Sequence, residues 1–300
     1  MRRCAAPVSP AWADIGLVYC AAVWGATFYL VKDALAGVDP VAMVAHRFLL
    51  AALLLAPWAL VRPSRGRYLK EAGLLAILLF LLYATQTVGL GYTSASNSGF
   101  ITGLFVIFVP IFLFFFFQKS PTPVQWASSA FALMGLWMLT GGISSVNFGD
   151  MITLVAAATY AGHLLATDKF VRADADALVL AFHQFWMTGL MALLFCLATG
   201  RPLAVSGDKA AGTIAFLAVI PTLSAFFIQM WAQKFTAPIK VSLIFSLEPV
   251  FAALFAWTLG GEAFVPARAA GGGLIVAAMM AGELSKLDLL KGRKKEILPT

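Results

Sequence analysis

The chain has 300 residues, of which 61% are hydrophobic and 12% are charged, and its formal net charge is +7 at pH 7. Soluble domains average about 45–50% apolar and about 25% charged residues, so this composition excludes an ordinary water-soluble fold. The hydrocarbon core of a bilayer is crossed by about 20 mostly apolar residues.

Ten apolar runs of about this length predict ten transmembrane helices. In chain order they cover residues 12–31, 41–61, 72–91, 98–117, 124–140, 150–169, 177–198, 212–232, 239–259 and 266–284. The first run follows "MRRC" without a small-residue cleavage site, which indicates a retained helix and not a signal peptide. The connecting segments are short, so we expect function to lie among the helices.

Basic residues are distributed unequally between the two sets of loops. If both termini are cytoplasmic, sixteen of the 21 Lys and Arg residues lie in inner segments, four lie in outer segments, and Arg47 lies within the second helix. This distribution satisfies the positive-inside rule. It supports the orientation with both termini cytoplasmic, and it explains the basic charge without a nucleic-acid partner.

The two halves of the chain repeat each other weakly and in the same order. "DIGLVYCAAVWGATFYLVKDAL" matches "DMITLVAAATYAGHLLATDKF" at a shift of 136 residues, and "AHRF" matches "FHQF" at a shift of 137. "YATQTVGLGYTSA" matches "FFIQMWAQKFTAP" at 143, and "FVPIFLFFF" matches "LEPVFAALF" at 139. Trp24 therefore aligns with Tyr160, Thr27 with His163, and Gln86 with Gln229.

An odd number of helices in each half forces the second half to enter the bilayer upside down relative to the first. This is the inverted-repeat plan of many secondary transporters, which hold their substrate between the halves and open to one side at a time. We expect an all-α membrane protein with ten transmembrane helices, arranged as two inverted five-helix repeats around a central cavity. The repeats cover residues 12–140 and 150–284, and residues 285–300 form a basic cytoplasmic tail.

Several segments carry a family resemblance over about residues 12–284. They are "AAVWGATFYLVKDAL", "AHRFLLAALLL", "GYTSAS", "SLEPVFAALFAWTLGGE" and "GGGLIVAAMMAG". Together they resemble the drug/metabolite transporter superfamily, in its ten-helix EamA-type branch. The resemblance implies a metabolite exporter of the cytoplasmic (inner) membrane with a central cavity, most similar to bacterial exporters of aromatic amino acids. The first half departs from the second in having no acid beside Pro110, which argues against two symmetrical carboxylates.

Polar groups within lipid-spanning helices are costly and are expected to face a cavity or a partner helix. The candidate substrate-binding residues are Trp24, Thr27, Tyr83, Gln86, Asn97, Tyr160, His163, Gln229 and Trp231. We expect the matched amides of Gln86 and Gln229 to hold an amino-acid backbone, or else to form an interhelical hydrogen bond worth about 1 kcal/mol. The rings of Trp24, Tyr83 and Tyr160 suit a planar substrate and its ammonium, although packing and interface anchoring also explain aromatic residues in membranes.

Two ionisable side chains, Glu248 and His163, are candidates for proton coupling. Glu248 precedes Pro249 within the ninth run, where it either steadies a proline kink or binds a proton or a substrate ammonium. His163 either binds a carboxylate or exchanges protons, or it is a neutral, hydrogen-bonded histidine. Pro110 and Pro249 are the expected hinges, because a proline leaves a helical carbonyl without its partner.

Other functions have less support from the sequence. The chain has no "HExxH" motif, no "GxSxG" motif and no clustered carboxylates, and its three cysteines have no metal-ligand spacing, so we expect neither an enzyme nor a metal or cofactor. The expected partners are membrane lipid and a small molecule, an amino acid or a similar metabolite. Alternatives are a nucleoside, sugar or sugar phosphate as cargo, or a non-transporting membrane receptor. The small-residue pattern "GFITG" permits close helix contact within one chain or between chains.

Overall fold

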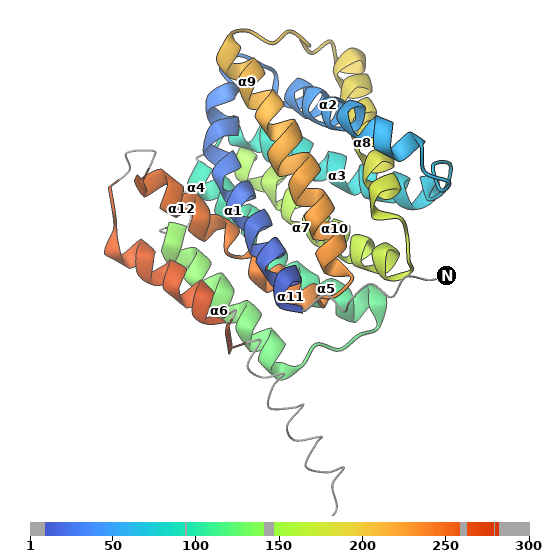
Figure 1. The fold of residues 1–300 in the computed structure, drawn as a ribbon. Helices are drawn as coiled ribbons and strands as arrows, with labels where there is room; N and C mark the ends of the chain where they lie inside the picture. Colours follow the sequence, from blue (N-terminus) through green and yellow to red (C-terminus); the bar gives the residue numbers. More distant parts are fainter. Residues whose placement is uncertain (1–9, 94, 141–146, 259–262, 279, 282–300) are drawn as a thin grey trace, which may run out of the picture.

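The computed structural model describes residues 10–93, 95–140, 147–258, 263–278 and 280–281, and within these ranges the chain forms helices and connecting loops (Figure 1). Eight helices in this part of the chain are long and apolar enough to cross a membrane. Large apolar side chains such as Trp58, Phe115 and Phe116 are exposed on the outside of the helices, as a lipid-facing surface requires. The predicted all-α membrane fold is confirmed.

The helices follow the ten expected runs in order. In the first half they are α1 (Pro10–Ala34), α2 (Pro40–Leu60), α3 (Leu69–Leu90), α4 (Ala95–Gly103), α5 (Phe105–Phe117) and α6 (Pro123–Thr140). In the second half they are α7 (Phe148–Arg172), α8 (Ala177–Thr199), α9 (Asp208–Leu217), the π-helix η1 (Ala218–Ser224), α10 (Ala225–Gln233), α11 (Pro238–Phe245) and α12 (Glu248–Thr258), followed by a helix over residues 266–278.

Three of the expected helices are not continuous α-helices, and two of them contain the predicted hinges Pro110 and Pro249. The fourth run is divided at Leu104 into α4 and α5, and the ninth is divided at residues 246–247 into α11 and α12. The same helix of each repeat is therefore broken. The eighth run contains η1, in which Pro221 lies. Discontinuous helices at corresponding places of two repeats are typical of secondary transporters.

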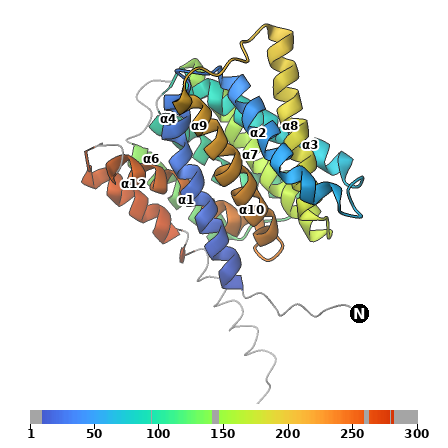
Figure 2. The ribbon, with the colours of Figure 1, turned by 45° about the horizontal axis from the view of Figure 1, so that its top comes forward.

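Contacts between the halves are reciprocal, as a pseudo-twofold axis requires. The second helices of the two halves, α2 and α8, pack on each other, α3 packs on α7, and α1 packs on η1 and α10. In turn, α1 contacts α11 and α12 while α7 contacts α4 and α5. Both views show α1 between α10 and α12 (Figures 1 and 2). This exchange of partners is the pattern that two halves related by a pseudo-twofold axis produce.

Matched residues build matched local structure in the two halves. Asp39 caps the N-terminus of α2 by accepting from Val41 N and Ala42 N at 2.9 and 3.2 Å, and Asp176, 137 residues later, caps α8 by accepting from Leu178 N at 3.1 Å. Such caps satisfy backbone donors that the first helical turn leaves unpaired. The repeat therefore extends to the starts of equivalent helices.

Glycines allow the fifth helix of each half to cross closely. A Cβ atom on Gly135 of α6 would lie 2.7 Å from the carbonyl oxygen of Gly271, and a Cβ on Gly271 would lie 2.6 Å from the carbonyl oxygen of Gly135. Residues larger than glycine would separate these backbones. In the "GFITG" segment, Gly103 packs on Leu136 of the same chain, so this contact is intramolecular.

Candidate functional site

A small cavity lies where the two halves meet, near the middle of α1, α3 and α7. Its lining consists of Trp24, Thr27, Leu82, Tyr83, Gln86, Tyr160, Phe226 and Glu248. The volume of the cavity, counted as the space that the centre of a water molecule can occupy, is about 20 Å³. A single water needs about 10–15 Å³ measured in this way, so the cavity in this conformation accommodates about one water and no amino-acid side chain.

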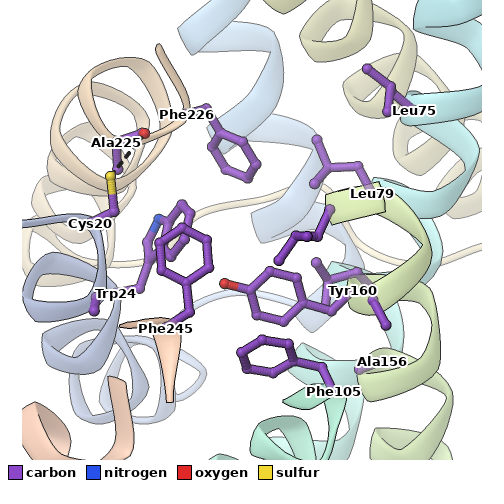
Figure 3. Packing of buried hydrophobic residues seen from close by; sticks show 14 of the residues in the cluster. Cys20, Trp24, Leu75, Leu79, Phe105, Ala156, Tyr160, Ala225, Phe226 and Phe245 are labelled. Carbon is purple, nitrogen blue, oxygen red and sulfur yellow. Dashed lines mark hydrogen bonds between the residues drawn. The ribbon is translucent and has the colours of Figure 1, made fainter. Parts of the chain in front are cut away.

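The aromatic wall of this cavity is built from matched positions of the repeat. Trp24 and Tyr160 meet edge to face with ring centroids 6.2 Å apart, and Tyr83 and Phe226, which also align, lie 6.3 Å apart. Figure 3 shows the Tyr160 hydroxyl directed towards Trp24 and Phe245. Phe245, which does not line the cavity, packs on Trp24 with ring centroids 5.0 Å apart. Such edge-to-face pairs fix ring orientation as well as burying apolar surface.

Polar groups on the cavity wall are only partly satisfied. The Tyr160 hydroxyl lies near the Glu248 carboxyl, yet it is fully buried and no hydrogen bond of good geometry reaches it. The Gln86 amide donates to Thr102 Oγ1 at 3.1 Å, and the Thr27 hydroxyl donates to the Trp24 carbonyl at 2.7 Å. A buried hydroxyl beside a carboxyl offers a polar group of a ligand both a donor and an acceptor.

The π-helix η1 forms one side of this region because of Pro221. A proline cannot donate to the carbonyl four residues earlier, here that of Leu217. The Thr222 hydroxyl instead donates to the Leu217 carbonyl at 2.7 Å, and the indole N–H of Trp24 donates to the Pro221 carbonyl at 2.8 Å. Single π-turns within helices are frequent at functional sites. The wall residue Trp24 is thereby joined to the irregular segment of the opposite half.

Glu248 reaches the cavity because the ninth helix restarts at this residue. Ser246 and Leu247 separate α11 from α12, so Pro249 lies in the first turn of α12, where its missing N–H would have had no helical partner. The backbone there is held by close packing: a Cβ on Gly25 of α1 would lie 2.5 Å from the Glu248 carbonyl oxygen. The expected kink at Pro249 is therefore a helix break just before Glu248.

Three of the nine predicted binding residues lie outside the cavity lining. The His163 ring lies behind the lining residue Phe226, with the two ring centroids 5.8 Å apart. Its Nε2 lies 3.0 Å from Gln184 Oε1. The Gln229 amide donates to Gln233 Oε1 at 3.0 Å, whereas the Gln86 amide donates to Thr102 Oγ1. Trp231 packs on Phe235. The side chain of Asn97 is outside the described part of the chain.

Two lining residues, Leu82 and Phe226, and one neighbour, Arg47, were not among the predicted site residues. Leu82 has no distinguishing chemistry, but Phe226 aligns with Tyr83 and the repeat would have indicated it. Pro110 lies within α5, six residues after the break at Leu104, so the helix is not interrupted at this predicted hinge. Among the described residues, no three His, Cys, Asp or Glu side chains are grouped to hold a metal ion.

The sequence model of the EamA-like transporter family matches this chain twice, over residues 11–141 and 147–281. The chain belongs to the EamA-like transporter family. The two matches fall on the two halves that the contacts between helices relate, so sequence and geometry identify the same repeat. As a member of this family the protein is a multi-pass membrane transporter.

Relatives support the same assignment. An uncharacterized transporter of Archaeoglobus fulgidus is 30% identical over 269 residues, which are 90% of this chain and 85% of the relative. The uncharacterized inner membrane transporter YedA of Escherichia coli strain K12 is 25% identical over 286 residues, 88% of each chain. A solved crystal structure has the same fold, with a TM-score of 0.78 over 92% of this chain and 98% of that chain at 18% identity.

Proposed function

We propose that this EamA-like transporter exports amino acids, aromatic ones included, by alternating access at the cavity between its halves. The observation that carries the proposal is the composition of the cavity wall. Rings at matched positions, Trp24 with Tyr160 and Tyr83 with Phe226, surround one carboxyl and one amide, those of Glu248 and Gln86. Flat apolar faces suit an aromatic side chain, and a carboxyl beside them suits an ammonium.

The small volume of the cavity favours a cycle with moving halves. A space for about one water cannot hold phenylalanine, so binding requires the wall to open. Helix breaks at Leu104 and at residues 246–247 and the π-helix η1 provide places where segments can change angle. In the orientation proposed here both termini are cytoplasmic, the membrane is the inner membrane, and the two repeats cover residues 12–140 and 150–284.

Transport by the purified protein in liposomes tests this function. Vesicles loaded with unlabelled phenylalanine should exchange it for external labelled phenylalanine, and protein-free vesicles should not. The set of labelled solutes should include tryptophan, alanine, a nucleoside, a hexose and a sugar phosphate. Exchange of the nucleoside, hexose or sugar phosphate without exchange of any amino acid would reject the proposed cargo but retain a transporter. Exchange of none of them would reject the substrate assignment altogether.

A further inference from the structure

Arg47 is a buried cation that forms no ion pair with any residue that the structure describes. It lies within α2, its side chain is among the buried residues at 3% exposure, and none of the ion pairs between described residues includes it. A charge within a membrane-spanning helix is costly unless it is paired, and such residues commonly line substrate pathways. Its position therefore requires an explanation that packing alone does not give.

The guanidinium of Arg47 is separated from the cavity by one side chain, Tyr83. Its carbon Cζ lies 4.4 Å from the centre of the Tyr83 ring, and the ring itself lines the cavity. Nε donates to Thr222 Oγ1 at 2.6 Å, whereas the bond from Nη2 to the Tyr83 hydroxyl is long, at 3.4 Å. The terminal N–H groups of the guanidinium can bind the two oxygens of a carboxylate side by side. Here they are held only weakly, and they lie next to the cavity.

The second half shows that the fold does not need a charge at this position. Arg47 aligns with Gln184, and the residues on either side are identical, His46 with His183 and Phe48 with Phe185. Gln184 is fully buried and its amide oxygen meets His163 at 3.0 Å. A neutral amide therefore serves the same place in the helix packing. The helix packing that the two halves share therefore does not explain why the first half has a guanidinium at this position.

We propose that Arg47 binds the carboxylate of the substrate once the Tyr83 ring moves aside. This assignment rests on the proposed function and specifies its cargo as a zwitterion. The Tyr83 ring lies 4.4 Å from the Arg47 guanidinium carbon and lines the cavity together with Glu248, so one basic and one acidic side chain lie close to this ring. A guanidinium and a carboxyl are the groups that suit the carboxylate and the ammonium of an amino acid. A phosphate dianion would leave a net negative charge at a site with one cation and one acid.

Binding of ligands that carry only one of the two charges tests the assignment. Calorimetric titration of the purified protein would use phenylalanine, 3-phenylpropionate, which has the carboxylate alone, and phenethylamine, which has the ammonium alone. In R47Q, which introduces the residue of the second half, we expect the Kd of the first two ligands to rise about tenfold or more, because charge-assisted forks are strong. The Kd of phenethylamine should stay within about twofold, since its ammonium does not meet the guanidinium. The matched control is R67Q, since Arg67 also stacks on a tyrosine, Tyr68 at 5.4 Å, but is exposed.

Several outcomes would overturn the proposal. In R47Q, equal weakening of the binding of all three ligands would contradict it, and so would unchanged binding of 3-phenylpropionate. In the wild type, absence of carboxylate binding would contradict it. So would binding of phenyl phosphate that depends on Arg47 and is tighter than the binding of 3-phenylpropionate. If R47Q does not fold, Arg47→Lys is the deciding variant. It keeps the charge but loses the paired N–H groups, so the binding of 3-phenylpropionate should weaken selectively. If liposomes show no amino-acid flux but 3-phenylpropionate binding depends on Arg47, the proposed function fails and the carboxylate site stands.

Discussion

Trp24 and Tyr160 occupy the same position in the two inverted halves, and they meet edge to face with ring centroids 6.2 Å apart. The next matched pair, Tyr83 and Phe226, lies at 6.3 Å. Equivalent residues of two halves come together only near the axis that relates them. The cavity that these four rings line is therefore on the pseudo-twofold axis, where inverted-repeat transporters bind their substrates.

The close contact of α1 with α12 predicts a strong effect of a single methyl group. In Gly25→Ala the new Cβ would meet the Glu248 carbonyl oxygen at 2.5 Å and the Ala252 nitrogen at 3.0 Å, both backbone atoms that cannot rotate away. We expect destabilisation of about 1–3 kcal/mol by overpacking, measured as a lower Tm in detergent, and loss of flux. Gly73→Ala is the control, because nothing lies within 4 Å of its Cβ. Equal Tm values for the two variants would contradict the packing described here.

The two roles of Trp24 can be separated by two substitutions. Trp24→Phe removes the N–H that donates to the Pro221 carbonyl but keeps an aromatic ring beside Phe226 and Phe245. We expect the loss of this hydrogen bond to lower the free energy of unfolding by about 0.6 kcal/mol, the average for hydrogen bonds between membrane helices, and by at most about 1.7 kcal/mol. Trp24→Ala also removes the ring and should abolish phenylalanine binding. If Trp24→Phe abolishes binding as completely as Trp24→Ala, the ring face is not the substrate contact.

Proton coupling, if flux responds to a pH gradient, should depend on Glu248 and not on His163. Glu248 lines the cavity, whereas His163 is bonded to Gln184 behind it. In E248Q the flux in liposomes should lose its response to an imposed pH gradient while exchange without a gradient is retained at a lower rate. His163→Gln should keep the response. The reverse pattern would move the proton site away from the cavity.

Asp39, at the start of α2, takes part in both a helix cap and an ion pair, and two substitutions separate the contributions of the two to stability. Asp39 both caps α2 and accepts from Arg201 at 2.9 Å, and the Arg201 side chain is 37% exposed. Arg201→Gln removes only the ion pair and should cost about 0–1 kcal/mol. Asp39→Ala also removes the cap, which is worth about 0.5–2 kcal/mol more. Thermal unfolding of both variants measures the difference, and a larger effect of Arg201→Gln would show that the cap contributes little.

Periodicity and repetition predicted much of this structure because both are properties of the chain itself. The order of the helices and the inverted repeat follow from apolar runs and an odd helix number. Trp24, Tyr83, Gln86 and Glu248 were found because polar and amphipathic groups are conspicuous among apolar residues, and the structure brings them together.

The remaining features depend on contacts that no local pattern contains. The π-helix at Pro221 is stabilised by Thr222 and by Trp24, nearly 200 residues earlier in the chain. Gln229 aligns with Gln86 but pairs with Gln233, which is specific to its own helix. In the sequence Arg47 is an isolated basic residue within a helix. Only the packing of α2 against η1 and α3 places it beside Tyr83.

Accessibility of a single cysteine at the cavity wall tests the central claim most directly. Thr27→Cys in a protein whose own three cysteines are replaced would be treated with a membrane-impermeant thiol reagent, added to one side of oriented vesicles and then, in separate samples, to the other. Alternating access predicts that the cysteine reacts from either side and that phenylalanine slows both reactions. Reaction from one side only, or from neither, would contradict a cavity that opens in turn to the two faces of the membrane.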